Sequence, residues 1–192
     1  KFLIFFEAQG LLNIFLSIPF LIIALDPDQS VTWKQIAAVI VWGVGIVGET
    51  VADLQLHFFK KKAAHETVCD VGLWNYSRHP NYFFESLVWI SYFLFTVSSP
   101  YGIFSAIAPL LILFFLFRVT GIPATEEQAL RSRPAAYRQY MKTTSMFVPW
   151  FKKSGESLTD RLLAGSLIPD FLIRYGFRSL NKQRLAGMEK IR

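Results

Sequence analysis

Residues 72–85 read GLWNYSRHPNYFFE, a run that sets a cation, an imidazole, amides, aromatic rings and a carboxylate against a long apolar stretch. Pro80 disfavours helical geometry at His79 and suits the first position of a helix, so a helix is predicted to begin there. The free N–H groups at that helix end would attract an anion. Arg78 offers a planar fork of donors, and the Asn81 amide can both donate and accept. Such residues can also serve only as headgroup anchors, but so many directional groups favour a binding site at a membrane surface.

The composition on either side of this segment is typical of a membrane protein. Hydrophobic residues make up 53% of the chain and charged residues only 18%, whereas soluble domains carry about 25% charged residues. We therefore expect an all-α polytopic bundle with about four transmembrane helices, antiparallel in chain order because the turns between them are short. The expected segments are Phe2–Leu25, Ile36–Thr50, Phe83–Ser98 and Tyr101–Thr120.

Basic residues are predicted to lie on one side of this bundle. They fall between the second and third segments and after the fourth, at Lys60, Lys61, Lys62, Arg78, Arg131, Arg133, Arg138 and Lys142. The positive-inside rule then places the 72–85 segment and the C-terminus in the cytoplasm. Because the charges flank apolar helices, the net charge of +6 indicates attraction to anionic lipid, and no nucleic-acid partner is expected.

Two carboxylates near the end of the second segment are a further candidate site. Glu49 and Asp53 are four residues apart and share a helix face. A carboxylate in the hydrocarbon region costs about 2.5–3.5 kcal/mol, so the pair is expected to face a polar cavity, unless both groups lie beyond the hydrocarbon and are simply solvated. The single cysteine, Cys69, excludes an internal disulfide and a cysteine-based zinc cluster, and no metal site is expected.

The chain begins at Lys1, already inside an apolar run, without a charged n-region or a cleavage site. A signal peptide is therefore not predicted, and the start is what a fragment with helices missing upstream would show.

The segment, the carboxylate pair and a downstream run together resemble the C-terminal half of the steroid 5-alpha-reductase family, particularly its bacterial members of unassigned substrate. The downstream run comprises Arg118, Glu126, Tyr137, Tyr140 and the Val148-Pro149-Trp150 triplet. The resemblance implies a membrane reductase that uses NADPH to saturate a carbon–carbon double bond of a lipid or sterol-like substrate. It also implies that basic side chains bind the cofactor phosphates and that Asp53 and Asn81 hydrogen-bond to ribose or amide groups. Gln9 would line the substrate pocket. The candidate cofactor-binding residues are Glu49, Asp53, Lys60, Arg78, His79, Asn81, Tyr82, Glu85, Arg118, Glu126, Tyr137 and Tyr140.

The resemblance leaves the catalytic residues unknown. The family's Glu and Tyr that polarise the substrate carbonyl lie upstream of anything present here, so Glu7 or Tyr82 would have to replace them in a complete chain. The family's histidines after the arginine matching Arg118 are replaced by Gly121-Ile122-Pro123, which suits a lipid other than a steroid.

Two alternatives remain open. The Arg-His-Pro-x-Tyr pattern and the Glu126-Glu127 pair also resemble the isoprenylcysteine carboxyl methyltransferases and related phospholipid methyltransferases, which bind S-adenosylmethionine. The other alternative is a non-catalytic membrane subunit that retains a nucleotide site. Glu49, Asp53 and Asn81 favour the reductase.

The chain is predicted to comprise a membrane domain, residues 1–151, and a basic amphipathic tail or linker, residues 152–192. An apolar stripe that includes Leu158, Leu162 and Phe171 suggests that this tail lies on the membrane. Its segment Ile168–Arg178 resembles the opening of cyclopropane-fatty-acid-synthase-like methyltransferases, which implies such an enzyme as a partner.

Overall fold

The structure is a computed structural model that describes residues 2–28, 30–62 and 67–152. The chain divides into two units, Lys1–Lys153 and Ser154–Arg192. The domain boundary expected after residue 151 stays a prediction. Apart from Lys152, the predicted amphipathic tail, including the Ile168–Arg178 segment, lies outside the described residues.

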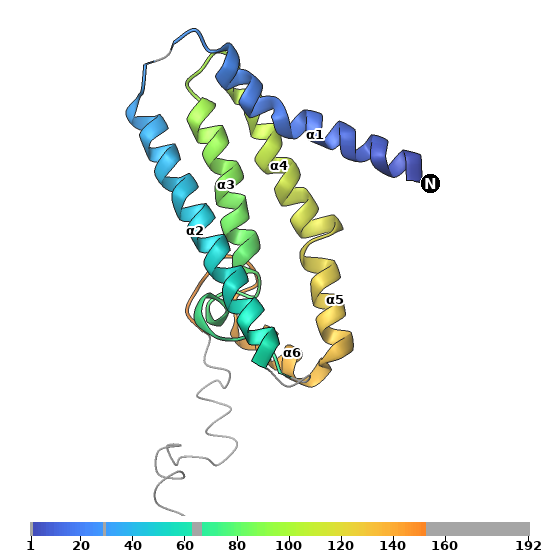
Figure 1. Cartoon of the computed structure of the whole chain (residues 1–192). Coiled ribbons are helices and arrows are strands. Elements are labelled where there is room, and N and C mark those ends of the chain that lie inside the picture. The colour runs from blue at the N-terminus through green and yellow to red at the C-terminus, as the bar shows by residue number, and fades with distance from the viewer. Residues whose placement is uncertain (1, 29, 63–66, 153–192) are drawn as a thin grey trace, which may run out of the picture. The chain divides into compact units, whose positions relative to one another are not determined.

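All regular elements within the described residues are helices, as expected (Figure 1). The long ones are α1 (Phe2–Leu25), α2 (Trp33–Lys62) and α3 (Pro80–Thr96). Shorter ones follow: α4 (Ile107–Phe114), α5 (Ile122–Ser132) and α6 (Pro134–Thr143). Three single turns complete the order, namely the 3-10 turns η1 (Gly72–Asn75) and η2 (Gly102–Ala106) and the π-helical turn η3 (Phe115–Val119).

Three described helical runs are long and apolar enough to cross a membrane, namely α1, α2 and the run Gly102–Ser132. They indicate an integral membrane protein. Helix α3 has 17 residues, at the short end of the length that spans hydrocarbon, and it packs along α2. The expected number of four transmembrane helices therefore stays a prediction.

The end expected for the second segment is wrong. The second segment was expected to end at Thr50, but α2 continues to Lys62 because no Pro or Gly follows Gly48 within it. Polarity alone does not end a helix. With 30 residues, α2 is about 45 Å long and exceeds the ~30 Å hydrocarbon core.

The fourth expected segment, Tyr101–Thr120, is helical over Gly102–Val119, but it is divided into η2, α4 and η3 and is not one regular α-helix. At its end the N–H groups of Thr120 and Gly121 both bond to the Phe115 carbonyl, which widens the last turn.

Helices α2 and α3 run side by side and make the most extensive helix pair of the bundle (Figure 1). The residues that α2 buries are Ala38, Gly45 and Ala52, spaced by seven, so one narrow stripe of small residues faces α3. A Cβ on Gly45 would lie 2.8 Å from the Val88 side chain and 3.1 Å from the Phe84 carbonyl oxygen. Because α2 and α3 pack this closely, the C-terminal end of α2 lies beside the N-terminal end of α3.

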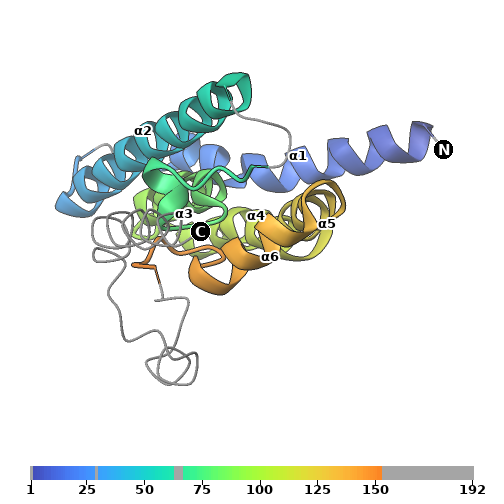
Figure 2. The ribbon, with the colours of Figure 1, turned by 90° about the horizontal axis from the view of Figure 1, so that it is seen from below.

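Helix α1 contacts α4, α3 and η2, and its N-terminal half extends away from the other helices (Figures 1 and 2). That half exposes large apolar side chains, among them Phe2, Ile4 and Phe6. Such a surface is compatible with lipid or with further membrane helices.

Candidate functional site

Buried polar contacts hold the 72–85 segment against α2. Gly72 has a φ of +57°, and a Cβ there would also collide with the Gln55 side chain. The Gln55 Oε1 accepts a hydrogen bond from the Leu73 N–H at 2.9 Å, and the Trp74 indole Nε1 donates to the Ala52 carbonyl at 2.8 Å. Only glycine accommodates both the backbone angle and the close approach.

The other side of the segment is held by residues 144–150, which return to it after α6. The Arg78 N–H donates to the Ser145 carbonyl at 2.8 Å, and the Trp150 N–H donates to the Tyr76 carbonyl at 2.9 Å. The fully buried Ser77 donates its hydroxyl to the Phe147 carbonyl at 2.7 Å and accepts the His79 N–H at 3.1 Å. The segment is therefore held by α2 at Leu73 and Trp74 and by residues 144–150 at Tyr76–Arg78, which positions Arg78 and His79.

The predicted helix start at Pro80 is confirmed. His79 precedes α3 with φ −138° and ψ 59°, outside the helical region, and Pro80 is the first helical residue. No side chain caps this helix N-terminus. Its N–H groups remain available where the cations of the segment gather.

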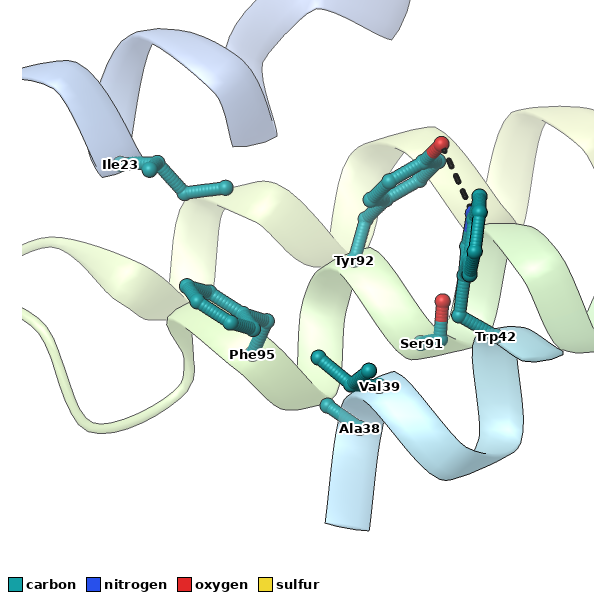
Figure 3. A pocket seen from close by; sticks show the side chains of 7 residues that line it. All are labelled: Ile23, Ala38, Val39, Trp42, Ser91, Tyr92 and Phe95. Atoms are coloured by element: carbon teal, nitrogen blue, oxygen red, sulfur yellow. Dashed lines mark hydrogen bonds between the residues drawn. The ribbon is translucent and has the colours of Figure 1, made fainter. Parts of the chain in front are cut away.

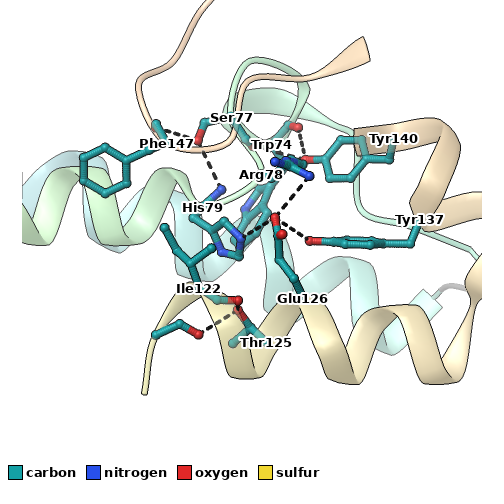
Figure 4. A network of polar contacts seen from close by, with 11 residues as sticks. Trp74, Ser77, Arg78, His79, Ile122, Thr125, Glu126, Tyr137, Tyr140 and Phe147 are labelled. Carbon is teal, nitrogen blue, oxygen red and sulfur yellow. Dashed lines mark hydrogen bonds and ion pairs between the residues drawn. The ribbon is translucent and has the colours of Figure 1, made fainter. Parts of the chain in front are cut away.

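Glu126 of α5 joins three of the predicted residues (Figure 4). Its Oε1 lies 3.1 Å from Nη1 of Arg78, 3.3 Å from Nε2 of His79 and 3.5 Å from the Tyr137 hydroxyl. Arg78 is 8% exposed and the Glu126 side chain 15% exposed, so the pair is shielded from solvent. Glu126 thus balances the Arg78 charge and orients the imidazole.

The tyrosines of α6 differ in their partners. The Tyr140 hydroxyl donates to the backbone carbonyls of Trp74 and Ser77, which ties α6 to the segment. The Tyr137 hydroxyl faces Glu126. Burial raises the pKa of both phenols above their usual range, so both are protonated donors at neutral pH.

A cavity of ≈ 520 Å³ lies between the C-terminal part of α2, residues 68–82, α5 and α6. Its volume is within the range of ligand pockets. The predicted residues that line it are Lys60, Arg78, His79, Asn81, Tyr82, Tyr137 and Tyr140. The structure thus gathers residues from four separate stretches of chain around one space.

Two lining side chains carry buried polar atoms without a hydrogen-bond partner. They are the Nε of Arg78 and the Oδ1 of Asn81. The Nη1 of Arg78 makes an ion pair with Glu126 but lacks hydrogen-bond geometry. Because buried polar groups are nearly always paired in folded proteins, these atoms indicate a ligand with complementary donors and acceptors.

Six predicted residues are not among those that line this cavity, and one of them, Glu126, contacts the lining residue Arg78. Glu49 and Asp53 of α2 and Glu85 of α3 interact electrostatically with one another, further along the helix pair than Asn81. Arg118 is exposed on η3, and Gln9 is exposed on α1.

No group of three or more His, Cys, Asp or Glu within residues 2–28, 30–62 and 67–152 is arranged to hold a metal ion.

The cavity also contains residues that were not predicted as site residues. Arg133, at the junction of α5 and α6, lines it and donates from Nη1 to the Thr67 carbonyl at 2.8 Å. Its position before Pro134 was the available signal, since a residue before proline ends a helix. Cys69 lines the cavity too, and its side chain is 5% exposed. Nothing in the spacing of Cys69 indicated this position.

Comparisons with known proteins identify a family without a described activity. A family model described as "Protein of unknown function (DUF1295)" matches residues 1–144, from α1 to the end of α6. A search of curated proteins and a search of solved structures found no match.

Proposed function

The chain belongs to the family of proteins of unknown function DUF1295, which includes steroid 5-alpha-reductase-like members, and we propose that it is a membrane-embedded NADPH-dependent reductase. Its cofactor would bind in the ≈ 520 Å³ cavity between α2, α3, α5 and α6. Its substrate would be a lipid or sterol-like molecule with a carbon–carbon double bond.

The observation that carries this proposal is the charge of the cavity lining. Lys60, Arg78 and Arg133 line the cavity, and no Asp or Glu is among its described lining residues. The Glu126 carboxylate neutralises the Arg78 charge from outside the cavity lining. The charges of Lys60 and Arg133 therefore remain to attract an anion. The uncapped N-terminus of α3 adds further positive potential at the same place.

This charge favours NADPH over S-adenosylmethionine. NADPH carries several phosphate charges, whereas S-adenosylmethionine carries a sulfonium cation that the same side chains would repel. Arginine also matches phosphate oxygens with two parallel donors. A cation-lined cavity of this size therefore supports a phosphorylated dinucleotide.

Different residues of the cavity would bind different parts of the cofactor. Lys60, Arg78 and Arg133 would hold phosphates, and the unpaired Asn81 Oδ1 would accept a hydrogen bond from a ribose hydroxyl or a carboxamide. The carboxylates of Asp53 and Glu85 lie further along α2 and α3 and would take hydroxyl or amide donors there. When bound, NADPH would supply a hydride.

The membrane location supports a substrate that dissolves in lipid. The cavity lies at one end of helices that are apolar along most of their length, so a lipid substrate could reach it without entering water. The basic ends of α2 and α6 lie at this same end (Figure 1), which supports the cytoplasm as the compartment of the cofactor site and of the C-terminus. A cyclopropane-fatty-acid-synthase-like partner remains part of this proposal.

A methyltransferase of the isoprenylcysteine type is the second candidate. The contact between Glu126 and the Tyr137 hydroxyl favours it, because that glutamate and tyrosine belong to the pattern shared with those enzymes. A non-catalytic subunit would bind nucleotide without turnover.

Titration of the purified full chain with NADPH and with S-adenosylmethionine tests the proposal. We expect Asn81→Ala and Arg133→Ala to weaken NADPH binding by about ten-fold or more, as loss of a buried or charge-assisted hydrogen bond does. Arg131→Ala is the matched control, because Arg131 is 78% exposed, pairs with Glu127 and lies outside the cavity lining. Tighter binding of S-adenosylmethionine would establish the second candidate, and binding of neither would refute a nucleotide site.

A further inference from the structure

A second cavity, of ≈ 260 Å³, lies at the opposite end of α2 and α3 from the cation-lined one. Helices α1 and α2 both contact α3 there, and the slot between them is lined by Ile23 of α1, Val39 and Trp42 of α2, and Tyr92 and Phe95 of α3 (Figure 3). The slot is separate from the proposed cofactor site and shares no residue with it.

The interior of the slot is apolar. The Trp42 indole Nε1 donates to the Tyr92 hydroxyl at 3.3 Å, which satisfies the indole donor (Figure 3). The Ser91 hydroxyl donates to the Val88 carbonyl of its own helix at 2.6 Å. An apolar cavity of roughly 150 Å³ already accepts a benzene molecule, so this one is large enough for part of a hydrocarbon chain.

The slot continues into a polar mouth. A further cavity of ≈ 180 Å³ shares Ile23 and Phe95 with the slot and is also lined by Asp26, Asp28 and Gln35. Asp26, Asp28, Ser30 and Val31, which lie between α1 and α2, line this mouth, and the shared residues Ile23 and Phe95 place it next to the slot. An apolar slot beneath a charged mouth matches an amphiphile.

The charges of the mouth are arranged by local hydrogen bonds. The Asp28 N–H donates to the Asp26 Oδ1 at 3.0 Å, and the Ser30 N–H donates to the Asp28 Oδ1 at 2.9 Å. Hydrogen bonds from Ser30 hold the pKa of Asp28 below its usual range, so it is anionic at neutral pH. Lys34 and Ser98 precede the lining residues Gln35 and Ser99, and the Lys34 Nζ donates to the Ser98 Oγ at 3.1 Å. Two carboxylates therefore line the opening, and the Lys34 ammonium belongs to a residue next in sequence to the lining residue Gln35.

We propose that this site binds a phospholipid with a primary ammonium in its headgroup, such as phosphatidylethanolamine. One acyl chain would occupy the slot, the ammonium would lie near Asp26 and Asp28, and the phosphate would face Lys34. Hydrocarbon gains little from leaving one apolar surrounding for another, so the headgroup contacts decide which lipid binds. An anionic lipid without an amine, such as phosphatidylglycerol, would meet the carboxylates unfavourably.

Native mass spectrometry of the full chain in detergent, titrated with dioleoyl-phosphatidylethanolamine or dioleoyl-phosphatidylglycerol, tests this proposal. Val39→Trp should weaken phosphatidylethanolamine binding by about ten-fold, because the indole fills the slot. Val47→Trp is the matched control, since Val47 lies on the same helix, is 63% exposed and does not line the slot. Asp28→Asn should reduce the preference for phosphatidylethanolamine by about two- to five-fold, as expected for an exposed ion pair.

The possible results distinguish a specific lipid site from unspecific lipid binding. Saturable binding of phosphatidylethanolamine that Val39→Trp weakens and Val47→Trp spares would support the site. Equal binding of the two lipids by the wild type, or equal effects of the two tryptophan variants, would overturn it. Val39 is 54% exposed, so its substitution leaves the helix packing intact. Asp28→Asn tests the headgroup contact independently of the slot.

Discussion

The hydroxyl group of Tyr140 is expected to stabilise the whole cation-lined site, and Tyr140→Phe removes only that group. Tyr140 is 6% exposed, and its hydroxyl donates to the carbonyls of Trp74 and Ser77, both of which are buried. Removing a buried donor leaves its acceptors unpaired and costs about 1–3 kcal/mol. In a chain of this length, 1 kcal/mol corresponds to about 2–4 °C in Tm.

We therefore expect Tyr140→Phe to lower the Tm of the detergent-purified protein by about 2–12 °C. Tyr101→Phe is the matched control, because Tyr101 is 77% exposed, and its hydroxyl removal should leave Tm unchanged. Thermal unfolding of both variants beside the wild type gives the comparison. A shift for Tyr140→Phe no larger than that for Tyr101→Phe would mean that α6 does not hold the 72–85 segment through this hydroxyl.

Two other predictions follow from the packing and from the cavity lining. Gly45→Val should destabilise the protein by about 1–3 kcal/mol through overpacking, whereas Gly43→Val should have little effect, because a Cβ at Gly45 meets α3 and a Cβ at Gly43 meets nothing within 4 Å. Equal Tm values for the two valine variants would contradict the close approach of α2 and α3. Burial raises the pKa of the Cys69 thiol, so alkylation should be slow near neutral pH, should accelerate as rising pH forms the thiolate, and should slow again when NADPH fills the cavity. Alkylation at the rate of a free thiol near neutral pH, measured by mass spectrometry, would show that Cys69 is accessible.

Much of the fold was predictable from local sequence signals. The apolar run of α1 has the predicted bounds Phe2–Leu25, and Pro80 begins α3 as predicted, because these signals act through hydrocarbon length and through the backbone angle of proline. The end of α2 was not predicted correctly. Polar residues such as Glu49 and Asp53 suggested that the helix stops, but a helix continues until a residue or a contact breaks it.

The candidate site was predictable only in its separate parts. Arg78, His79 and Asn81 are adjacent in the chain, so their proximity follows from the sequence alone. The position of Glu126 against Arg78 does not, since it depends on how α5 turns back after Gly121. The role of Arg133 in the cavity lining likewise depends on the junction between α5 and α6.

The sequence by itself determined that this chain is a helical membrane protein, where its first apolar helix lies and which segment carries most of its polar chemistry. Those properties depend on composition, on hydrophobic length and on local backbone preferences, all of which act between near neighbours. The tertiary structure decided which distant residues meet: Tyr140 with Ser77, Glu126 with Arg78, and Asp28 with the slot beneath it. Such meetings depend on how the chain turns between helices and on how the helices pack, and packing between helices has no periodic signature that identifies the partner helix.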